Sequence, residues 1–133
     1  MRVIRKEHVS DDLKKFIREQ IRTVLRLEVL LLLYRNQPKS FSSEEIAAEL
    51  GFEDDVAQEQ LPALAEIGIL ATSGAGGANF SYDPTTEKVR NMVSQLALTY
   101  TTQRVMILSL ILSEGPDRIR IFTEAIKLLR GKD

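Results

Sequence analysis

Three helix-length apolar patterns, followed at once by a short hairpin pattern, occupy residues 24 to 82 of this 133-residue chain. The first pattern, which ends near Arg35, is apolar on nearly every side, as in a helix that other elements surround. The second opens at Ser42, where Glu45 three residues later completes a capping box, and Gly51 is placed to end it. The order helix, helix, helix, hairpin predicts a mainly α fold with one small β-hairpin.

A third helix is expected after Asp55, which forms a second candidate cap with Gln58. Its apolar face has helical spacing and comprises Ala57, Leu61, Leu64, Ala65 and Gly68. Residues 69–73 and 79–82 have the pattern of two strands, and the segment between them is rich in glycine, namely Gly74, Gly76 and Gly77. A phosphate-cradling loop would need a helix directly after these glycines, whereas a strand follows, so the segment is predicted to be the turn of the hairpin.

Further helices are predicted on both sides of this central segment. Ser10 is a candidate cap for an N-terminal helix, and a long helix is expected from about Thr86 to Ser113. Gly115 and Pro116 would end that helix, and Asp117 would cap a short terminal one. We therefore expect a single domain over residues 1–133, with an N-terminal helix in 1–23, three helices and the hairpin in 24–83, and C-terminal helices in 84–133.

Charge is distributed unevenly along the chain. No lysine or arginine occurs between Lys39 and Lys88, although the formal net charge of the whole chain is only −1. The same stretch contains ten acids: Glu44, Glu45, Glu49, Glu53, Asp54, Asp55, Glu59, Glu66, Asp83 and Glu87. Such an asymmetry says little about the fold, but it indicates which surface attracts which partner.

Composition argues against several classes of protein. The chain has no cysteine, so thiolate metal sites and disulfides are excluded, and no apolar run approaches the roughly 20 residues that span a bilayer. The single histidine, His8, has no second imidazole for a metal site or a catalytic triad. We find no enzyme signature and expect a cytoplasmic protein with no cofactor, no metal, no catalytic residues and no membrane association.

The segment from Val24 to Tyr82 resembles a winged helix-turn-helix module. The resemblance is carried by "FSSEEIAAELGFEDDVAQEQLPALAEIGIL" as the helix-turn-helix and by "ATSGAGGANFSYDP" as the wing. With the extra helices at both ends, the chain is most similar to MarR-like and PadR-like bacterial regulators. That resemblance implies transcription control and a homodimer built by the flanking helices.

In that family the recognition helix corresponds to residues 55–67 here, and its outward positions are Asp55, Glu59, Pro62 and Glu66. Carboxylates in this place would approach a wall of phosphates that repels them, and no cation stands nearby in the sequence. Pro62 removes the hydrogen bond to the Gln58 carbonyl, which costs about 3 kcal/mol or kinks a helix. The resemblance therefore favours DNA as a partner, and the charge of this face disfavours it.

Two other features suggest partners. A basic row of Lys14, Lys15, Arg18 and Arg22 would bind phosphates, an acidic protein or the recognition helix of a neighbouring subunit, or would simply be a solvated face. The run from Val105 to Leu112 is apolar around most of a helix, more than one core face requires. It predicts dimer contacts at Val105, Ile107, Leu108, Ile111 and Leu112. The alternative is that the first and last helices of the same chain cover this apolar surface.

Three functions remain open from the sequence. The preferred one is a non-enzymatic, regulator-like protein whose acidic helix-turn-helix face meets a basic surface of a protein partner. The second is a DNA-binding regulator of the MarR or PadR kind that reaches phosphates through its flanking basic helices. The third is a sensor of a small apolar ligand held between helices.

Overall fold

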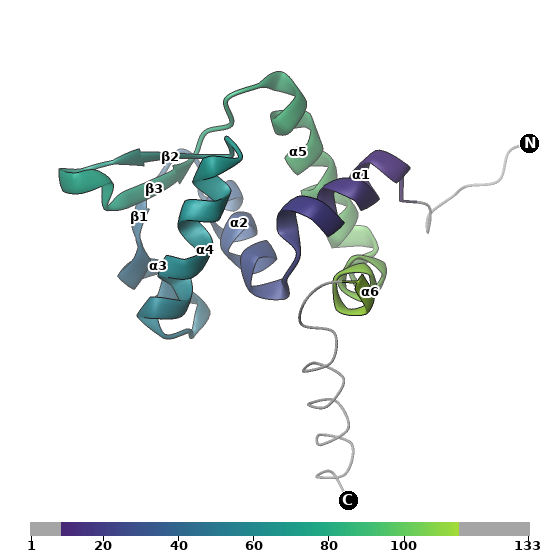
Figure 1. Ribbon diagram of the computed structural model, residues 1–133, viewed down its shortest axis with the longest axis horizontal. Coiled ribbons are helices and arrows are strands. Elements are labelled where there is room, and N and C mark those ends of the chain that lie inside the picture. Colours follow the sequence, from purple (N-terminus) through teal and green to yellow (C-terminus); the bar gives the residue numbers. More distant parts are fainter. Residues whose placement is uncertain (1–8, 115–133) are drawn as a thin grey trace, which may run out of the picture. The chain divides into compact units, whose positions relative to one another are not determined.

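The computed structural model describes residues 9–114 of the chain. Most of this part is helical, and the remainder includes a three-stranded antiparallel sheet, so the prediction of a mainly α, winged-helix fold is confirmed. In chain order the elements are α1 (Asp11–Phe16), the π-helix η1 (Ile17–Ile21), α2 (Val24–Arg35), β1 (Phe41–Ser42), α3 (Ser43–Leu50), α4 (Asp54–Glu66), β2 (Leu70–Ser73), the 3-10 helix η2 (Ala75–Gly77), β3 (Asn79–Tyr82), α5 (Glu87–Thr102) and α6 (Arg104–Glu114) (Figure 1).

The chain groups into two compact units, which we call the terminal unit and the central unit. The terminal unit takes in the chain up to Val24 and from Leu98 onward, and the central unit runs from Leu25 to Ala97. The helix-turn-helix and the hairpin lie in the central unit. The expectation of one domain over the whole chain stays a prediction, and both His8 and the short helix expected after Asp117 lie outside the described residues.

Local side-chain signals set the start and the end of α3. The Ser42 hydroxyl accepts from the Glu45 backbone N–H at 3.1 Å, and the Ser42 N–H donates to the Glu45 carboxylate at 2.9 Å. Gly51 ends the helix with a φ of +79°, a conformation that costs other residues energy because of their Cβ. The predicted capping box and glycine stop are therefore confirmed.

The expected cap of the next helix was wrong. Helix α4 begins at Asp54, and its N-cap residue, Glu53, lies two residues before the predicted cap and makes no side-chain capping bond. Gln58 donates to Asp54 rather than taking part in a capping box with Asp55. Neither aspartate is the N-cap, although both have the short acceptor side chain that favours that position, and both lie in the first turn of α4 instead.

The hairpin is extended by a third strand that the sequence did not predict. Strand β3 lies between β1 and β2, with Phe41 opposite Phe80 and Leu70 opposite Tyr82. Tyr82 also meets Tyr34 of α2 edge to face, at 5.1 Å between ring centroids. Burial raises the pKa of the Tyr82 phenol above its ordinary value, the neighbouring Tyr34 adds to this rise, and Arg90 opposes it.

In the terminal unit, α6 packs against the π-helix η1. Each of these two elements has two isoleucines that are fully or almost fully buried: Ile17 and Ile21 in η1, and Ile107 and Ile111 in α6. The helix leading into this packing starts where the sequence placed it, since the Ser10 hydroxyl accepts from the Leu13 N–H at 3.1 Å.

The long C-terminal helix expected from Thr86 to Ser113 is instead two helices, because the helix is interrupted at Gln103, between α5 and α6. Thr101 and Thr102 both direct their hydroxyls to the carbonyl of Leu98. Side-chain hydroxyls that bond to backbone carbonyls compete with helix geometry and bend helices, and this explains the break. Apolar periodicity continued through the threonines, so the pattern gave no warning of it.

No single helix among the described residues is both long and apolar enough to cross a membrane. Helices α5 and α6 meet such a test of length and composition only when they are taken together across their break.

We predict that Gly68→Ala destabilises the protein more than Gly51→Ala. Both residues have positive φ, which costs an alanine about 1–2 kcal/mol. A Cβ on Gly51 would meet nothing within 4 Å, whereas one on Gly68 would lie 2.5 Å from the Thr85 hydroxyl oxygen. The two variants are compared by urea unfolding followed by circular dichroism. Thr85→Ala should remove the difference in the Gly68→Ala background, and equal midpoints of the single variants would contradict the argument.

Candidate interaction face

The rotation of α4 about its own axis is decided by its apolar residues. Ala57, Leu61 and Leu64 are 0% exposed, so the opposite side of the helix faces solvent. The predicted outward positions are indeed exposed, and we call them the acidic stripe: Asp55, Glu59, Pro62 and Glu66. At 3.6 residues per turn these four positions follow one line along the helix.

Negative charge extends beyond the acidic stripe. The central unit has no lysine or arginine between Lys39 and Lys88, so all the ionised side chains of α3, α4 and the hairpin are carboxylates. Six further acids in that stretch are exposed: Glu44, Glu45, Glu49, Glu53, Asp83 and Glu87. Within the stripe, Asp55 and Glu59 are an i,i+4 pair of like charge, which destabilises a helix by about 0.2–0.5 kcal/mol.

Pro62 lies inside α4, which continues past it to Glu66. The ring has no N–H to donate to the carbonyl of Gln58, one turn earlier. Its exposed position means that tertiary packing does not require a proline there. Pro62 is therefore a locally unfavourable residue at the centre of the acidic stripe.

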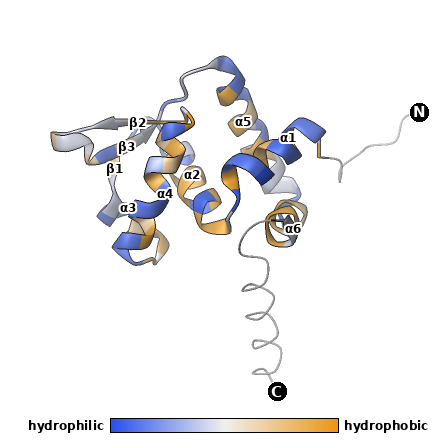
Figure 2. Cartoon of the chain, viewed as in Figure 1, coloured by the Kyte–Doolittle hydropathy of each residue, from blue (hydrophilic) through white to orange (hydrophobic). Residues whose placement is uncertain are grey.

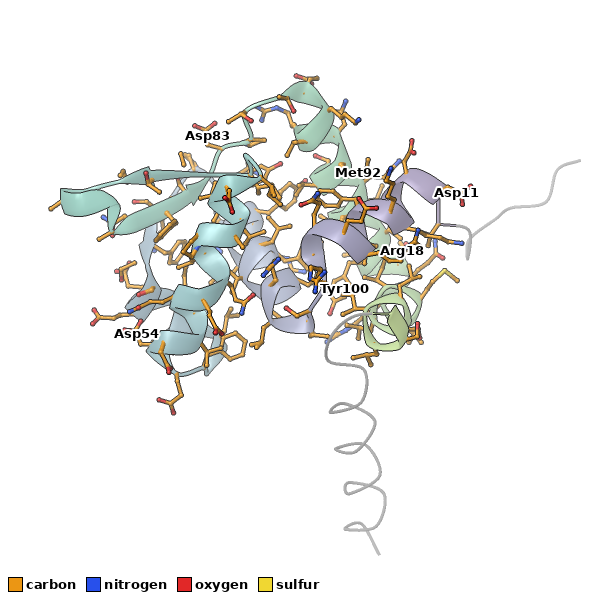
Figure 3. All side chains as sticks on the ribbon, viewed as in Figure 1. Asp11, Arg18, Asp54, Asp83, Met92 and Tyr100 are labelled. Carbon is orange, nitrogen blue, oxygen red and sulfur yellow. The ribbon has the colours of Figure 1, made fainter. Side chains whose placement is uncertain are left out.

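Asp54 joins the two helices of the helix-turn-helix. One carboxylate oxygen accepts from the Ser43 hydroxyl at 2.8 Å, and the other accepts from the Gln58 amide at 3.0 Å. The residue lies at the start of α4, where the N-terminal end of the helix favours negative charge (Figure 3). The sequence did not single out Asp54, because Ser43 is eleven residues away and only the fold brings it near.

A second link ties α4 to α2 in the core of the central unit. Gln60 is only 7% exposed, and its side-chain oxygen accepts from Arg26 at 3.2 Å. Sequence reasoning missed this pair. The sequence did contain a signal for it, because Gln60 is three residues after Ala57 and four before Leu64 and so lies on the apolar face of the helix. A polar side chain that is buried in this way usually has a hydrogen-bond partner.

The wing tip is uncharged and built from glycine. Gly74, Gly76 and Gly77 have φ values of +80°, +66° and +67°, the conformation that the predicted turn requires. Apart from the single 3-10 turn η2, the next element is strand β3, so no α-helix follows these glycines as in a phosphate-binding loop. The wing offers no cation to a nucleic acid.

The basic row in the terminal unit is less regular than its spacing suggested. Lys15, Arg18 and Arg22 are exposed and Lys14 is partly buried. The change from α1 to the π-helix η1 at Ile17 falls inside the row, and Arg22 lies beyond the helix at a φ of +67°. The four side chains therefore do not follow the spacing of one straight α-helix. Arg18 of this row is labelled in Figure 3.

The residues expected to form dimer contacts differ in exposure. Val105 is 77% exposed and Leu108 and Leu112 are partly exposed, whereas Ile107 and Ile111 are buried within the chain itself. Helix α6 is coloured mostly hydrophobic in Figure 2. Beside Val105, a largely apolar cavity of about 680 Å³ opens at the break between α5 and α6. The free apolar surface of α6 is thus narrower than the sequence suggested.

No protein-family model and no curated protein matches the sequence. Among solved structures, the chain is similar to the heme sensor protein PefR from Streptococcus agalactiae in complex with heme, with a TM-score of 0.52 at 15% identity over 90% of this chain and 80% of that one. It is also similar to MepR, a transcription regulator of the Staphylococcus aureus multidrug efflux pump MepA, with a TM-score of 0.48 at 13% identity over 92% and 91% of the two chains. A possible transcriptional regulator from Methanosarcina mazei gives a TM-score of 0.47 at 14% identity over 74% and 85%.

At these identities the likeness concerns the fold alone. The similarity to PefR agrees with the winged helix, the three-stranded sheet and the flanking helices described above. The prediction of a winged-helix fold with additional helices on both sides is confirmed.

We predict that Pro62→Ala stabilises the protein. The variant restores an N–H that can donate to the Gln58 carbonyl, and proline inside a helix costs about 3 kcal/mol relative to alanine. Because Pro62 is exposed, no core contact is lost. Thermal unfolding followed by circular dichroism should show a higher midpoint, and an unchanged or lower one would mean that α4 has already adapted to the proline.

Proposed function

We propose that this chain is a non-enzymatic regulator that acts mainly through protein–protein contacts, and that its acidic stripe meets a basic surface of the partner. The observation that carries the proposal is the exposure of Asp55, Glu59 and Glu66 on the recognition helix. These are the positions that a winged helix presents to its partner.

The sign of the charge is the physical reason for preferring a protein to DNA. Duplex DNA carries about one negative charge per 1.7 Å of its axis, and affinity comes first from cations that neutralise those phosphates. The acidic stripe would bring like charges to that surface, and the uncharged wing tip would offset none of them. A basic protein surface instead relieves the repulsion between Asp55 and Glu59.

DNA binding is the second candidate function, and a different observation favours it. The chain has the winged helix-turn-helix fold, and helix-turn-helix modules commonly bind DNA with their second helix. The cations available for phosphates would be Lys14, Lys15, Arg18 and Arg22 of the terminal unit. Such binding would weaken steeply with salt, by about one log unit per log of salt for each phosphate neutralised.

A charge-reversal variant tests the proposal. Asp55, Glu59 and Glu66 are changed together to lysine, and the matched control changes Glu49, Asp83 and Glu87, which are also exposed and give the same change in net charge. In pull-downs from the native host, we expect the unchanged chain and the control to retain the same protein partner and the stripe variant to lose it. If both variants lost the partner, binding would depend on the total charge of the chain rather than on this face.

The same proteins separate the two candidates on DNA. If the stripe is a protein-binding face, its reversal improves DNA retention or leaves it unchanged. If the chain binds DNA instead, we expect the unchanged chain to bind duplex DNA with a steep salt dependence. The double variant Arg18→Ala, Arg22→Ala should then have a shallower salt dependence, equivalent to the loss of up to two phosphate contacts. Tight, salt-dependent binding by the unchanged chain would overturn the preference for a protein.

We further propose that the chain forms a homodimer through the exposed part of α6. Val105 is a large apolar side chain left 77% exposed, and the apolar cavity beside it gives a second copy a recess to fill. The resemblance to MarR-like regulators implies the same use of flanking helices. Ile107 and Ile111 then serve the chain's own core, and Val105, Leu108 and Leu112 form the contact.

We predict that Val105→Glu converts the dimer to a monomer in sedimentation velocity, because a carboxylate would have to lose its water on association. Since Val105 is exposed, the monomer should remain folded. Ala48→Glu is the matched control, an exposed alanine of α3 in the central unit, and should leave the mass unchanged. A dimer that survives Val105→Glu would place the contact elsewhere.

A further inference from the structure

A groove of about 290 Å³ lies within the central unit, between the helix-turn-helix and the wing. Its walls come from three elements: Ser43 at the start of α3, Gln58, Leu61 and Pro62 on α4, and Ala78 and Phe80 of the wing. These residues are adjacent in space only because the hairpin folds back beside α4. The groove is therefore a product of the tertiary structure.

The polar side chains in these walls already have partners. Ser43 and Gln58 donate to the two oxygens of Asp54, at 2.8 Å and 3.0 Å. The other side chains named above are apolar, from leucine, proline, alanine and phenylalanine. Both side chains direct these hydrogen bonds to Asp54, so an apolar occupant does not compete with it for them.

The acidic stripe runs alongside the groove on the same helix. Pro62 belongs both to the stripe and to the groove wall. Since successive residues are 100° apart around the helix axis, Asp55 and Glu59 differ from Pro62 in direction by less than the rotation of one residue. A segment seated in the groove would therefore have carboxylates next to it. Its own flanking side chains would be attracted if they were lysine or arginine and repelled if they were acidic.

The size of the groove separates a polypeptide from a free small molecule. Pockets for small ligands usually have volumes of about 300–1,000 Å³ and enclose most of the ligand, whereas this groove lies at the small end of that range and two of its wall residues, Pro62 and Ala78, are exposed to solvent. It suits one large side chain whose backbone stays outside. We propose that the groove binds a polypeptide segment that inserts one apolar side chain between Pro62 and Ala78, with flanking lysines or arginines against Asp55 and Glu59.

This proposal rests on the proposed function and specifies the partner's chemistry. The probes are two fluorescent lysine-rich peptides that are identical except for a central leucine in one and a central serine in the other. Binding is measured by fluorescence anisotropy. We expect the leucine peptide to bind the unchanged chain about ten- to a hundredfold more tightly, the usual benefit of burying one such side chain.

Filling the groove should remove that preference. Ala78→Leu occupies the space, and Ala75→Leu is the matched control at an exposed wing-tip position outside the walls. We expect Ala78→Leu to bind the leucine peptide only as weakly as the serine peptide. Ala75→Leu should still bind the leucine peptide more tightly than the serine peptide. Thermal unfolding of both variants shows that they remain folded.

The outcomes separate this inference from the proposed function. Equal binding of both peptides to the unchanged chain overturns the groove but leaves the acidic stripe as a basic-partner surface. Serine-peptide binding that does not respond to reversal of Asp55, Glu59 and Glu66 overturns the proposed function as well. Duplex DNA that displaces the leucine peptide from the unchanged chain but not from Ala78→Leu would assign the groove to nucleic acid and overturn the proposal.

Discussion

Burial of the apolar side of α4 is the constraint on which the interaction face depends. Once Ala57, Leu61 and Leu64 are inside, the helical period leaves no choice about which residues point outward. The carboxylates of the acidic stripe face solvent for that reason, and no rotation of the helix can hide them without exposing the core. Their charge is thus a fixed property of the surface on which a winged helix normally depends for binding.

Around that helix, polar contacts set positions rather than supply most of the stability. Asp54 holds the start of α4 against Ser43, and Gln60 holds its middle against Arg26. A net gain of about 0.5–1.5 kcal/mol is typical for one such bond, less than the burial of a single leucine. Their effect is to fix the position of α4, which forms one wall of the groove.

The sequence predicted the parts of this structure whose causes are local. The Ser42–Glu45 capping box, the glycine stop at Gly51 and the glycine-rich wing turn each involve residues only a few positions apart, so a short window contains the whole interaction. Prediction failed at Gln103 and at the π-helix after Phe16, where apolar periodicity continues through a change of backbone geometry. It also missed β1, because a strand of two residues has no pattern of its own.

The negative charge of α4 and the lack of lysine and arginine between Lys39 and Lys88 followed from the order of amino acids alone, since helical period and composition need no distant partner to be read. The pairing of Arg26 with Gln60 and the groove between Pro62 and Ala78 became visible only in the folded chain. Each of these depends on elements that are separated along the sequence and meet through tertiary packing. A one-dimensional pattern records which faces are apolar, but not which other face will cover them.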